Sequence, residues 1–267
     1  MNKENQNDYL VQQKCLYSAI LKKNMNINIF LPPKYNDLSN LPVLFFLHGR
    51  DGSQNIVYEI NMHKAAAGMI EEGVIKPLII VFPQMDNSSG LNSSPDYREV
   101  QDPVTTERTL NLGRYQDYFL EEAIPFVQKT LKIDCPYNST YIGGVSGGGY
   151  AALHIALNHL KLFSRVGGHM PAIELTIEEE DEPYYYSQQF WIEHDPVSIA
   201  EKLNYNPIDV YLDCGDEDEG RFYIGCEKLH NILSNKGIKS QNHLFKGKHD
   251  LEYISSNVEK YLLFYGK

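Results

Sequence analysis

The first regular pattern along the chain is an alternation of apolar and polar residues. It covers Cys15 to Leu21 and Met25 to Leu31, with the polar residues Lys22 to Asn24 between them. A period of two residues places every second side chain on one face of a strand. Two such segments joined by a short polar turn therefore predict an antiparallel hairpin.

After this hairpin the character of the predicted strands changes. Val43 to Leu47 and Leu78 to Phe82 are apolar at every position, which is typical of strands covered on both faces. Four shorter strands, each followed by a helix or a long loop, are predicted at Tyr141–Val145, Ser164–Gly167, Val210–Asp213 and Asn242–Phe245. We expect these segments to form one mostly parallel sheet.

Helical periods separate the predicted strands. One stripe runs from Tyr115 to Leu131 and contains Pro125, which predicts a kink or a helix boundary there. Two further stripes run from Phe222 to Leu233 and from Leu251 to Tyr265. This order predicts an α/β protein with an N-terminal antiparallel hairpin, helices on both faces of the sheet, and ligands at the carboxyl ends of the strands. We expect a single domain over residues 1–267.

Two long segments interrupt the regular alternation. Asp86 to Gly113 is rich in Asn, Ser, Asp and Thr, and Pro171 to Leu203 carries the acidic run Glu178–Glu182, then Tyr184–Tyr186 and Trp191. Loops of this length in a compact domain are usually functional. Both follow predicted strands, so we expect them to form walls or a lid around a site.

Composition narrows the class of function. The 267 residues carry a formal net charge of −11, which disfavours nucleic acid and anionic membrane surfaces as partners. No apolar run approaches the roughly 20 residues of a membrane helix, and the polar first residues lack a secretory signal. The sequence therefore favours the cytoplasm, with a trimmed secreted form left open. Its four scattered cysteines predict reduced thiols.

The sharpest chemical signal is a serine between glycines. Gly144, Ser146 and Gly148 form a Gly-x-Ser-x-Gly pattern after the strand Tyr141–Val145 and before an apolar helical segment. A nucleophile elbow needs a strand, a tight turn and a helix in this order, with small residues flanking the serine. Ser146 is therefore the candidate nucleophile; the alternative is a glycine-rich turn with an idle serine.

A serine nucleophile needs a histidine base, which in this fold follows the serine and the acid in the chain. His249 lies in a turn between the last predicted strand and the C-terminal helix, where its side chain can reach back over the sheet. His169 and His194 are the alternatives. We therefore assign the base to His249.

The acid should follow the preceding strand, where the sequence offers several carboxylates. Asp213 lies at the strand end, and Asp216 and Asp218 lie in the loop beyond it. A loop residue can extend toward the histidine better than a residue at the strand end, which favours the loop. This argument does not distinguish Asp216 from Asp218. A solvated acidic turn would have the same composition.

An acyl-transfer site also needs backbone donors for the anionic intermediate. The N–H of Gly147 follows the nucleophile, and a second N–H is expected in the loop that follows the strand ending at Leu47. There Arg50 would supply its backbone N–H, and its side chain need not take part. A glycine turn without a catalytic role would have the same sequence, so the assignment of Arg50 depends on the other candidate residues of the site.

With these residues identified, the chain resembles the esterase D and feruloyl esterase-like group of the α/β-hydrolase superfamily over roughly Cys15 to Phe264. The matching motifs are Leu47-His48-Gly49, Glu121-Glu122-Ala123-Ile124-Pro125, Gly144 to Gly148, Cys214-Gly215-x-x-Asp218 and Gly247-x-His249-Asp250. The resemblance implies the α/β-hydrolase fold and favours Asp218 as the acid. Gly147 departs from the group, in which this position is often methionine.

The residues together predict a serine carboxylic ester hydrolase that acts on small acyl or aryl esters, and the resemblance implies feruloyl or acetyl esters of carbohydrates among them. Neither a metal nor an organic cofactor is expected, and a homo-oligomer is compatible with the sequence. His169 and Trp191 are the candidate substrate-binding residues. The alternatives are an S-formylglutathione hydrolase-type thioesterase, an acyltransferase, and a catalytically inactive ligand-binding relative.

Overall fold

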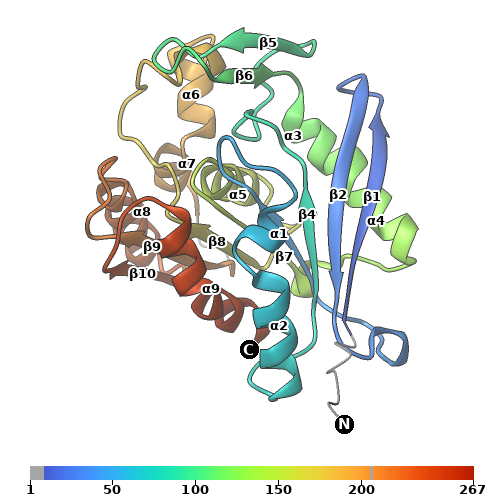
Figure 1. Cartoon of the computed structure of the whole chain (residues 1–267). Coiled ribbons are helices and arrows are strands. Elements are labelled where there is room, and N and C mark those ends of the chain that lie inside the picture. The colour runs from blue at the N-terminus through green and yellow to red at the C-terminus, as the bar shows by residue number, and fades with distance from the viewer. Residues whose placement is uncertain (1–8, 205–206) are drawn as a thin grey trace.

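The computed structural model describes residues 9–204 and 207–267. Within these ranges a mixed eight-stranded sheet forms the centre, with strand order β1-β2-β4-β3-β7-β8-β9-β10 (Figure 1). Its strands are β1 (Leu10–Ser18), β2 (Lys23–Leu31), β3 (Val43–Leu47), β4 (Ile79–Pro83), β7 (Thr140–Val145), β8 (Arg165–His169), β9 (Asp209–Gly215) and β10 (Ser240–Phe245). The pairs β1/β2 and β2/β4 are antiparallel, and the other neighbours are parallel. The predicted fold class is confirmed.

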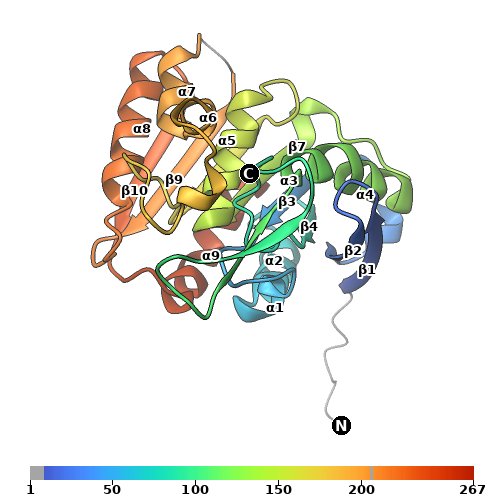
Figure 2. The same ribbon diagram turned by 90° about the horizontal axis from the view of Figure 1, so that it is seen from above.

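Helices cover both faces of this sheet (Figure 2). One face carries α1 (Ile56–Glu59), α2 (Met62–Glu71) and α9 (Leu251–Gly266), and the other carries α4 (Ile124–Leu131), α5 (Gly147–Asn158), α7 (Pro196–Lys202) and α8 (Tyr223–Asn235). The remaining helices are α3 (Tyr115–Asp117) and α6 (Gln188–His194). No helix in the described ranges is both long enough and apolar enough to cross a membrane.

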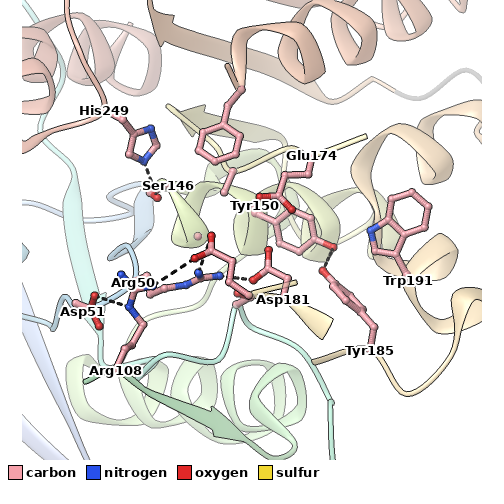
Figure 3. Close-up of a pocket in the computed structure, with 15 residues that line it drawn as sticks. Arg50, Asp51, Arg108, Ser146, Tyr150, Glu174, Asp181, Tyr185, Trp191 and His249 are labelled. Carbon is pink, nitrogen blue, oxygen red and sulfur yellow. Dashed lines mark hydrogen bonds and ion pairs between the residues drawn. The ribbon is translucent and has the colours of Figure 1, made fainter. Parts of the chain in front are cut away.

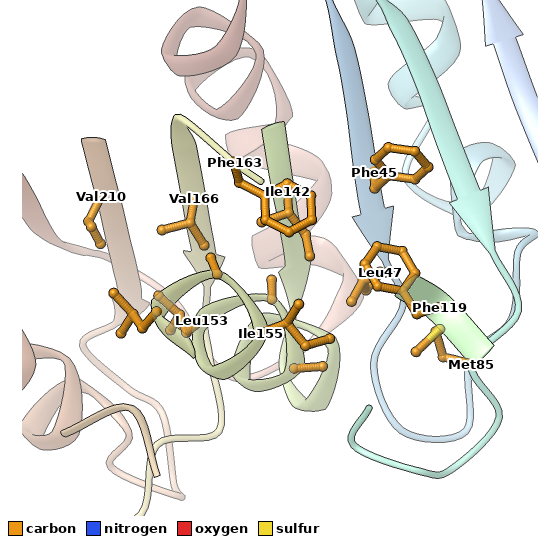
Figure 4. Packing of buried hydrophobic residues seen from close by; sticks show 14 of the residues in the cluster. Phe45, Leu47, Met85, Phe119, Ile142, Leu153, Ile155, Phe163, Val166 and Val210 are labelled. Atoms are coloured by element: carbon orange, nitrogen blue, oxygen red, sulfur yellow. The ribbon is translucent and has the colours of Figure 1, made fainter. Parts of the chain in front are cut away.

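Two hydrophobic cores explain why the central strands are apolar at every position. In β3, Phe45 and Leu47 point into the core beneath α5, whereas Leu44 and Phe46 point into the core beneath α2 and α9. Phe119 packs edge-on against Phe45 at a ring distance of 5.6 Å (Figure 4). Since successive side chains of a strand face opposite sides, both sets must be apolar.

The N-terminal hairpin is present, but its turn lies earlier than the sequence predicts. Ser18 pairs with Lys23, so the turn spans residues 19–22 rather than Lys22 to Asn24. The carboxylate of Glu122, on the helical segment beneath, accepts hydrogen bonds from the backbone N–H groups of Ala19 and Ile20 at 2.9 and 3.2 Å. This long-range contact fixes a turn that local pattern misplaces.

Pro125 coincides with a change in helix geometry, as predicted. The helix that begins as α3 becomes a π-helical segment over Tyr118–Ala123, and α4 begins at Ile124 with the proline in its first turn. Proline has no N–H and its ring clashes with the carbonyl four residues earlier. The wider π turn therefore accommodates it without ending the helix.

The two long segments predicted as walls or a lid, the first insertion (residues 86–113) and the second insertion (residues 171–203), contain more regular structure than expected. The first carries the small antiparallel sheet formed by β5 (Arg98–Gln101) and β6 (Thr109–Leu112). The second carries α6 and α7, and Val197, Ile199 and Ala200 of α7 are buried against the core. Ahead of α6, residues 171–187 form a strap that has no strand or α-helix and contains one 3-10 turn, Glu182–Tyr184.

A buried polar network ties α9 to the sheet and corrects the prediction for His169. Its ring is fully buried, with Nδ1 2.9 Å from Asp213 Oδ1 and the ring stacked on Tyr261 at 3.7 Å. Tyr253 donates to the same carboxylate at 2.7 Å. His169 cannot contact substrate here, and Asp213 is occupied within the core. The sequence placed Asp213 correctly near a strand end but ended the preceding strand at Gly167, two residues before His169, and it did not show which face either side chain points to.

Candidate active site

The predicted elbow is a tight turn between β7 and α5. Ser146 has φ of 52° and ψ of −123°, a conformation that non-glycine residues rarely adopt. A Cβ on Gly148 would lie 2.2 Å from the carbonyl oxygen of His48, and one on Gly144 would lie 2.5 Å from that of Gly148. Only glycine allows these backbones to approach, and the turn leaves the Ser146 hydroxyl in the cavity.

A line of hydrogen bonds joins three of the predicted side chains. His249 Nε2 lies 2.8 Å from Ser146 Oγ (Figure 3), and its Nδ1 lies 3.1 Å from Asp218 Oδ2. The Asp218 carboxylate is buried and also accepts from the N–H of Gly220 at 2.9 Å. The ring of Phe222 packs edge-on against His249 at 5.1 Å. These contacts hold the imidazole with one nitrogen on the serine and one on the carboxylate.

The other candidates for acid and base have different partners. Asp216 accepts from the N–H of Gly247 at 3.0 Å and so fastens the loop that carries His249. His194 contacts the carbonyl of Phe190 within α6. The structure thus brings Asp218 rather than Asp216 to the histidine, a choice that the sequence pattern alone left open.

The loop after β3 lies against the elbow. Gly49 is close to the serine, since a Cβ on it would be 3.2 Å from Ser146 Cβ. A Cβ on Gly147 would be 3.8 Å from Arg50 N and 3.9 Å from Ser89 Oγ. A side chain would therefore fit at position 147, and nothing in the structure explains the glycine there. Both expected backbone N–H groups belong to residues that line the cavity.

His48 helps to hold the loop after β3, a role that the sequence pattern does not indicate. Its buried ring contacts the carbonyl of Gly49 through Nδ1 at 2.8 Å and accepts from the N–H of Met85 through Nε2 at 2.9 Å. Burial lowers its pKa below the ordinary value. As a neutral ring it can make both bonds, and so connects the loop after β3 to the end of β4.

The serine opens into two cavities. A polar cavity of about 270 Å³ contains the hydroxyl and the His249 ring, and its wall is lined in part by Tyr150, Tyr185, Trp191 and Phe222. A second cavity of about 310 Å³ also borders Ser146 and His249. Its wall combines the apolar residues Ile56, Val145, Met170 and Ile254 with charged side chains, among them Glu59 and Asp250. An ester bound at the serine can therefore place its two arms in unlike surroundings.

The tyrosines of the second insertion are divided between roles. Tyr184 is buried and donates to the carbonyl of Asn87 at 2.6 Å, so it anchors the strap to the first insertion. Tyr185 donates to Tyr150 at 2.9 Å in the cavity wall, whereas Tyr186 is exposed and packs against Phe190. Of Tyr184–Tyr186 and Trp191, only Tyr185 and Trp191 therefore line the cavity that contains the serine hydroxyl.

A cluster of charges forms the cavity wall opposite His249 (Figure 3). Arg50 pairs with Glu180 at 3.1 Å and with Asp181, and Arg108 pairs with Asp51 at 2.8 Å and approaches Glu180 at 3.5 Å. The acidic run is evident in the sequence, but its partners are not, because the two arginines come from distant loops.

Three carboxylates in the cavity wall lie close enough together to be considered as ligands for a cation. Glu174, Glu180 and Asp181 place oxygen atoms within 4.8 Å of one another in the part of the chain that the structure describes. Arg50 already pairs with two of them. Burial beside Asp181 raises the pKa of Glu174 to about 9, so that it is a neutral acid at neutral pH. One guanidinium and one proton therefore compensate two of the three negative charges of the cluster.

The raised pKa of Glu174 makes stability depend on pH. The folded protein keeps the proton up to about pH 9, whereas the unfolded chain releases it near the ordinary value of 4.5. The stability linked to this proton is present below pH 4.5 and is lost as pH rises through 9. We expect Glu174→Gln to unfold at higher urea than the wild type at pH 8.5 but not at pH 5.

Urea titrations at pH 5, 7 and 8.5 measure this difference. Glu227→Gln, at an exposed position of α8, is the matched control and should follow the wild type at each pH. Parallel pH curves for Glu174→Gln and the wild type would show that Glu174 is ionised in the folded protein.

Comparison with known proteins places the chain in a family. The model of the esterase family, described as "Putative esterase", matches residues 18–262. This match spans the sheet from β2 to β10 and the motifs from the loop after β3 to His249. It covers more of the chain than any single motif of the site.

Solved structures with the same fold carry related names. A ferulic acid esterase superposes with a TM-score of 0.79 at 20% identity, covering 97% of this chain and 98% of its own. An S-formylglutathione hydrolase from Agrobacterium tumefaciens gives 0.76 at 17% identity, covering 98% and 96%. A fluorophosphonate-binding serine hydrolase of Staphylococcus aureus gives 0.73 at 18% identity, covering 95% and 97%. At these identities the likeness shows the fold, and the family match supplies the activity class. The chain belongs to the esterase family of the α/β-hydrolase fold and is a carboxylic ester hydrolase.

Proposed function

We propose that the chain hydrolyses small-molecule esters with Ser146 as nucleophile, His249 as general base and acid, and Asp218 as the group that orients His249. The observation that carries this proposal is the continuous line from Ser146 Oγ to His249 and on to Asp218, at 2.8 and 3.1 Å, within a cavity. A serine hydroxyl is a weak nucleophile unless an adjacent base takes its proton.

The reaction proceeds in two halves. Ser146 Oγ attacks the acyl carbonyl while His249 Nε2 takes the hydroxyl proton, and the carbonyl oxygen becomes an anion. The intermediate then collapses, and His249 returns the proton to the departing alcohol. Water repeats the attack on the acyl-enzyme and releases the acid. Asp218 accepts from the Nδ1 side and stabilises the imidazolium formed in each half.

The anion that forms in each half is assigned to the backbone N–H groups of Arg50 and Gly147. The approach of Arg50 N to Gly147 and the position of both residues at the cavity support this assignment. Hydrogen bonds to the oxyanion strengthen only as charge develops, so they lower the barrier rather than improve substrate binding.

For the substrate we propose acyl or aryl esters, with feruloyl and acetyl esters of carbohydrates as the leading class. The solved structures named as ferulic acid esterases support this choice. So does the cavity wall formed by Tyr185 and Trp191, since planar side chains pack well on aryl and sugar rings. The second candidate is thioester hydrolysis of the S-formylglutathione type, which is favoured by the neighbours of that name.

Loss of the nucleophile should abolish hydrolysis. We expect Ser146→Ala to lower kcat by more than about 10³-fold, because no other group forms the acyl-enzyme. The assay uses p-nitrophenyl acetate and butyrate, methyl ferulate and S-formylglutathione, and the preferred ester identifies the substrate class. Ser234→Ala, at an exposed position of α8, is the control. A Ser146→Ala variant with wild-type kcat would refute the mechanism.

The two neighbouring aspartates should behave differently. Asp218→Asn presents an amide to His249 Nδ1 and should lower kcat by about 10³- to 10⁴-fold through loss of the correct tautomer. Asp216→Asn still offers an oxygen to the N–H of Gly247 and should keep kcat within about twofold. Steady-state kinetics on p-nitrophenyl acetate compares them. If Asp216→Asn lost the activity and Asp218→Asn kept it, the acid would be reassigned.

Trp191 should contribute to substrate choice if it lines a ring-binding subsite. We expect Trp191→Ala to lower kcat/KM for methyl ferulate by about fivefold or more, because stacking area is lost, while p-nitrophenyl acetate is little affected. Relative rates on the two esters measure this effect. Unchanged relative rates would show that Trp191 does not contribute to a ring-binding subsite and only packs α6 against its surroundings.

A further inference from the structure

The loop that carries the Arg50 N–H has little regular structure to hold it. It connects β3 to α1, and the N–H of Gly52 bonds to the carbonyl of Gly49 at 3.1 Å. Asp51 has a φ of 60°, which non-glycine residues adopt at a cost. A backbone donor for an oxyanion must stand in one place, so contacts from outside the loop have to fix it.

The side chain of Arg50 supplies one such contact. Its guanidinium pairs with Glu180 Oε1 at 3.1 Å and with Asp181 Oδ1, both on the strap over residues 171–187. The side chains of Arg50 and Asp181 are only 17% and 14% exposed, and water therefore screens this pair weakly. Two carboxylates on one planar guanidinium also fix its direction, which a single surface pair does not.

Asp51, the next residue, is held from the other insertion. Its carboxylate accepts from Arg108 Nε at 2.8 Å and from Asn87 Nδ2 at 3.0 Å, and its N–H donates to Asn87 Oδ1 at 2.7 Å. Arg108 in turn pairs with the buried Asp102 at 3.1 Å. The loop is thus clamped between two insertions that are more than 50 residues apart in the chain.

The insertions are themselves anchored, so the clamp has a fixed base. A small apolar cluster joins Leu91, Leu110 and Leu112 of the first insertion to Tyr184 of the strap and Tyr150 of α5. Tyr184 stands three residues after Asp181 and is fully buried. Asp181 is therefore presented to Arg50 by a segment that packs on the domain.

We propose that the Arg50 side chain is a positioning residue for ester hydrolysis, and that its ion pairs with Glu180 and Asp181 hold the N–H of the same residue where the oxyanion forms. This inference rests on the proposed function, in which that N–H is an oxyanion donor. The guanidinium acts through its own backbone and takes no part in bond making. The strap therefore serves the chemical step as well as the cavity wall.

A positioning role has a kinetic signature. The N–H of Arg50 bonds to a fully developed oxyanion only in the transition state. Loosening the loop that carries it should therefore lower kcat and leave KM nearly unchanged. A role in substrate binding, through the guanidinium or through the cavity residues Tyr185 of the strap and Trp191 of α6, should instead raise KM. Complete loss of one oxyanion donor typically costs about 10²- to 10³-fold in kcat, and a loosened donor should lose less.

The test compares variants at both ends of the ion pair on p-nitrophenyl acetate. We expect Arg50→Met and the double variant Glu180→Gln/Asp181→Asn each to lower kcat by about tenfold or more, with KM within about twofold. Arg50→Lys keeps the charge but not the planar fork, and should recover part of kcat. The double variant keeps the shape of both side chains, so its kcat still tests the role of the ion pairs where Arg50→Met fails to fold. Arg98→Met, at an exposed position of β5, is the matched control.

The outcomes separate this inference from the proposed function. A wild type that hydrolyses esters, with Ser146→Ala inactive and both clamp variants at wild-type kcat, overturns the inference alone. A raised KM with unchanged kcat overturns it too and assigns the cluster to substrate binding. A wild-type rate that Ser146→Ala retains refutes the proposed function itself.

Discussion

Close packing between the turn after β7 and the loop after β3 is the constraint on which the site depends. Gly148 lies so near the carbonyl groups of Leu47 and His48 that a single added carbon would overlap them. This approach brings the loop that carries Arg50 beside Ser146. Because β3 and β7 are parallel neighbours, both loops leave the same sheet edge, and the glycines convert that proximity into contact.

The remaining parts of the site reach this edge from farther along the chain. His249 follows β10 and Asp218 follows β9, which is the parallel neighbour of β10. The network of Asp213, His169 and the tyrosines of α9 fastens the helix that begins just after His249. Burial of these polar groups is costly unless each has a partner, so the network specifies one position for α9.

Charge is distributed unevenly around the serine. The cavity that faces the insertions carries paired arginines and carboxylates, whereas the wall of the second cavity adds the apolar residues Ile56, Val145, Met170 and Ile254 to its charged residues. Removing one member of a half-buried ion pair leaves the other without a partner, which costs more than a surface pair contributes. The charged wall is therefore a half-buried part of the candidate active site rather than a solvated surface.

The sequence by itself determined the class of fold and the identity of Ser146 and His249 as candidates. Periodicity of two and of 3.6 residues reports which faces of an element are covered, and the glycine pattern reports a turn that only small residues can form. These are local properties, and they located the elbow and the strands of the main sheet to within a few residues, except β1, which starts at Leu10 rather than Cys15.

Only the tertiary structure decided which distant groups meet. It placed Asp218 rather than Asp216 on His249, withdrew His169 into the core, moved the hairpin turn onto Glu122, and joined Arg50 to the acidic strap. Neighbouring loop carboxylates have the same reach in sequence, and a strand-end histidine can point to either face. Their partners depend on long-range packing, which no local pattern records.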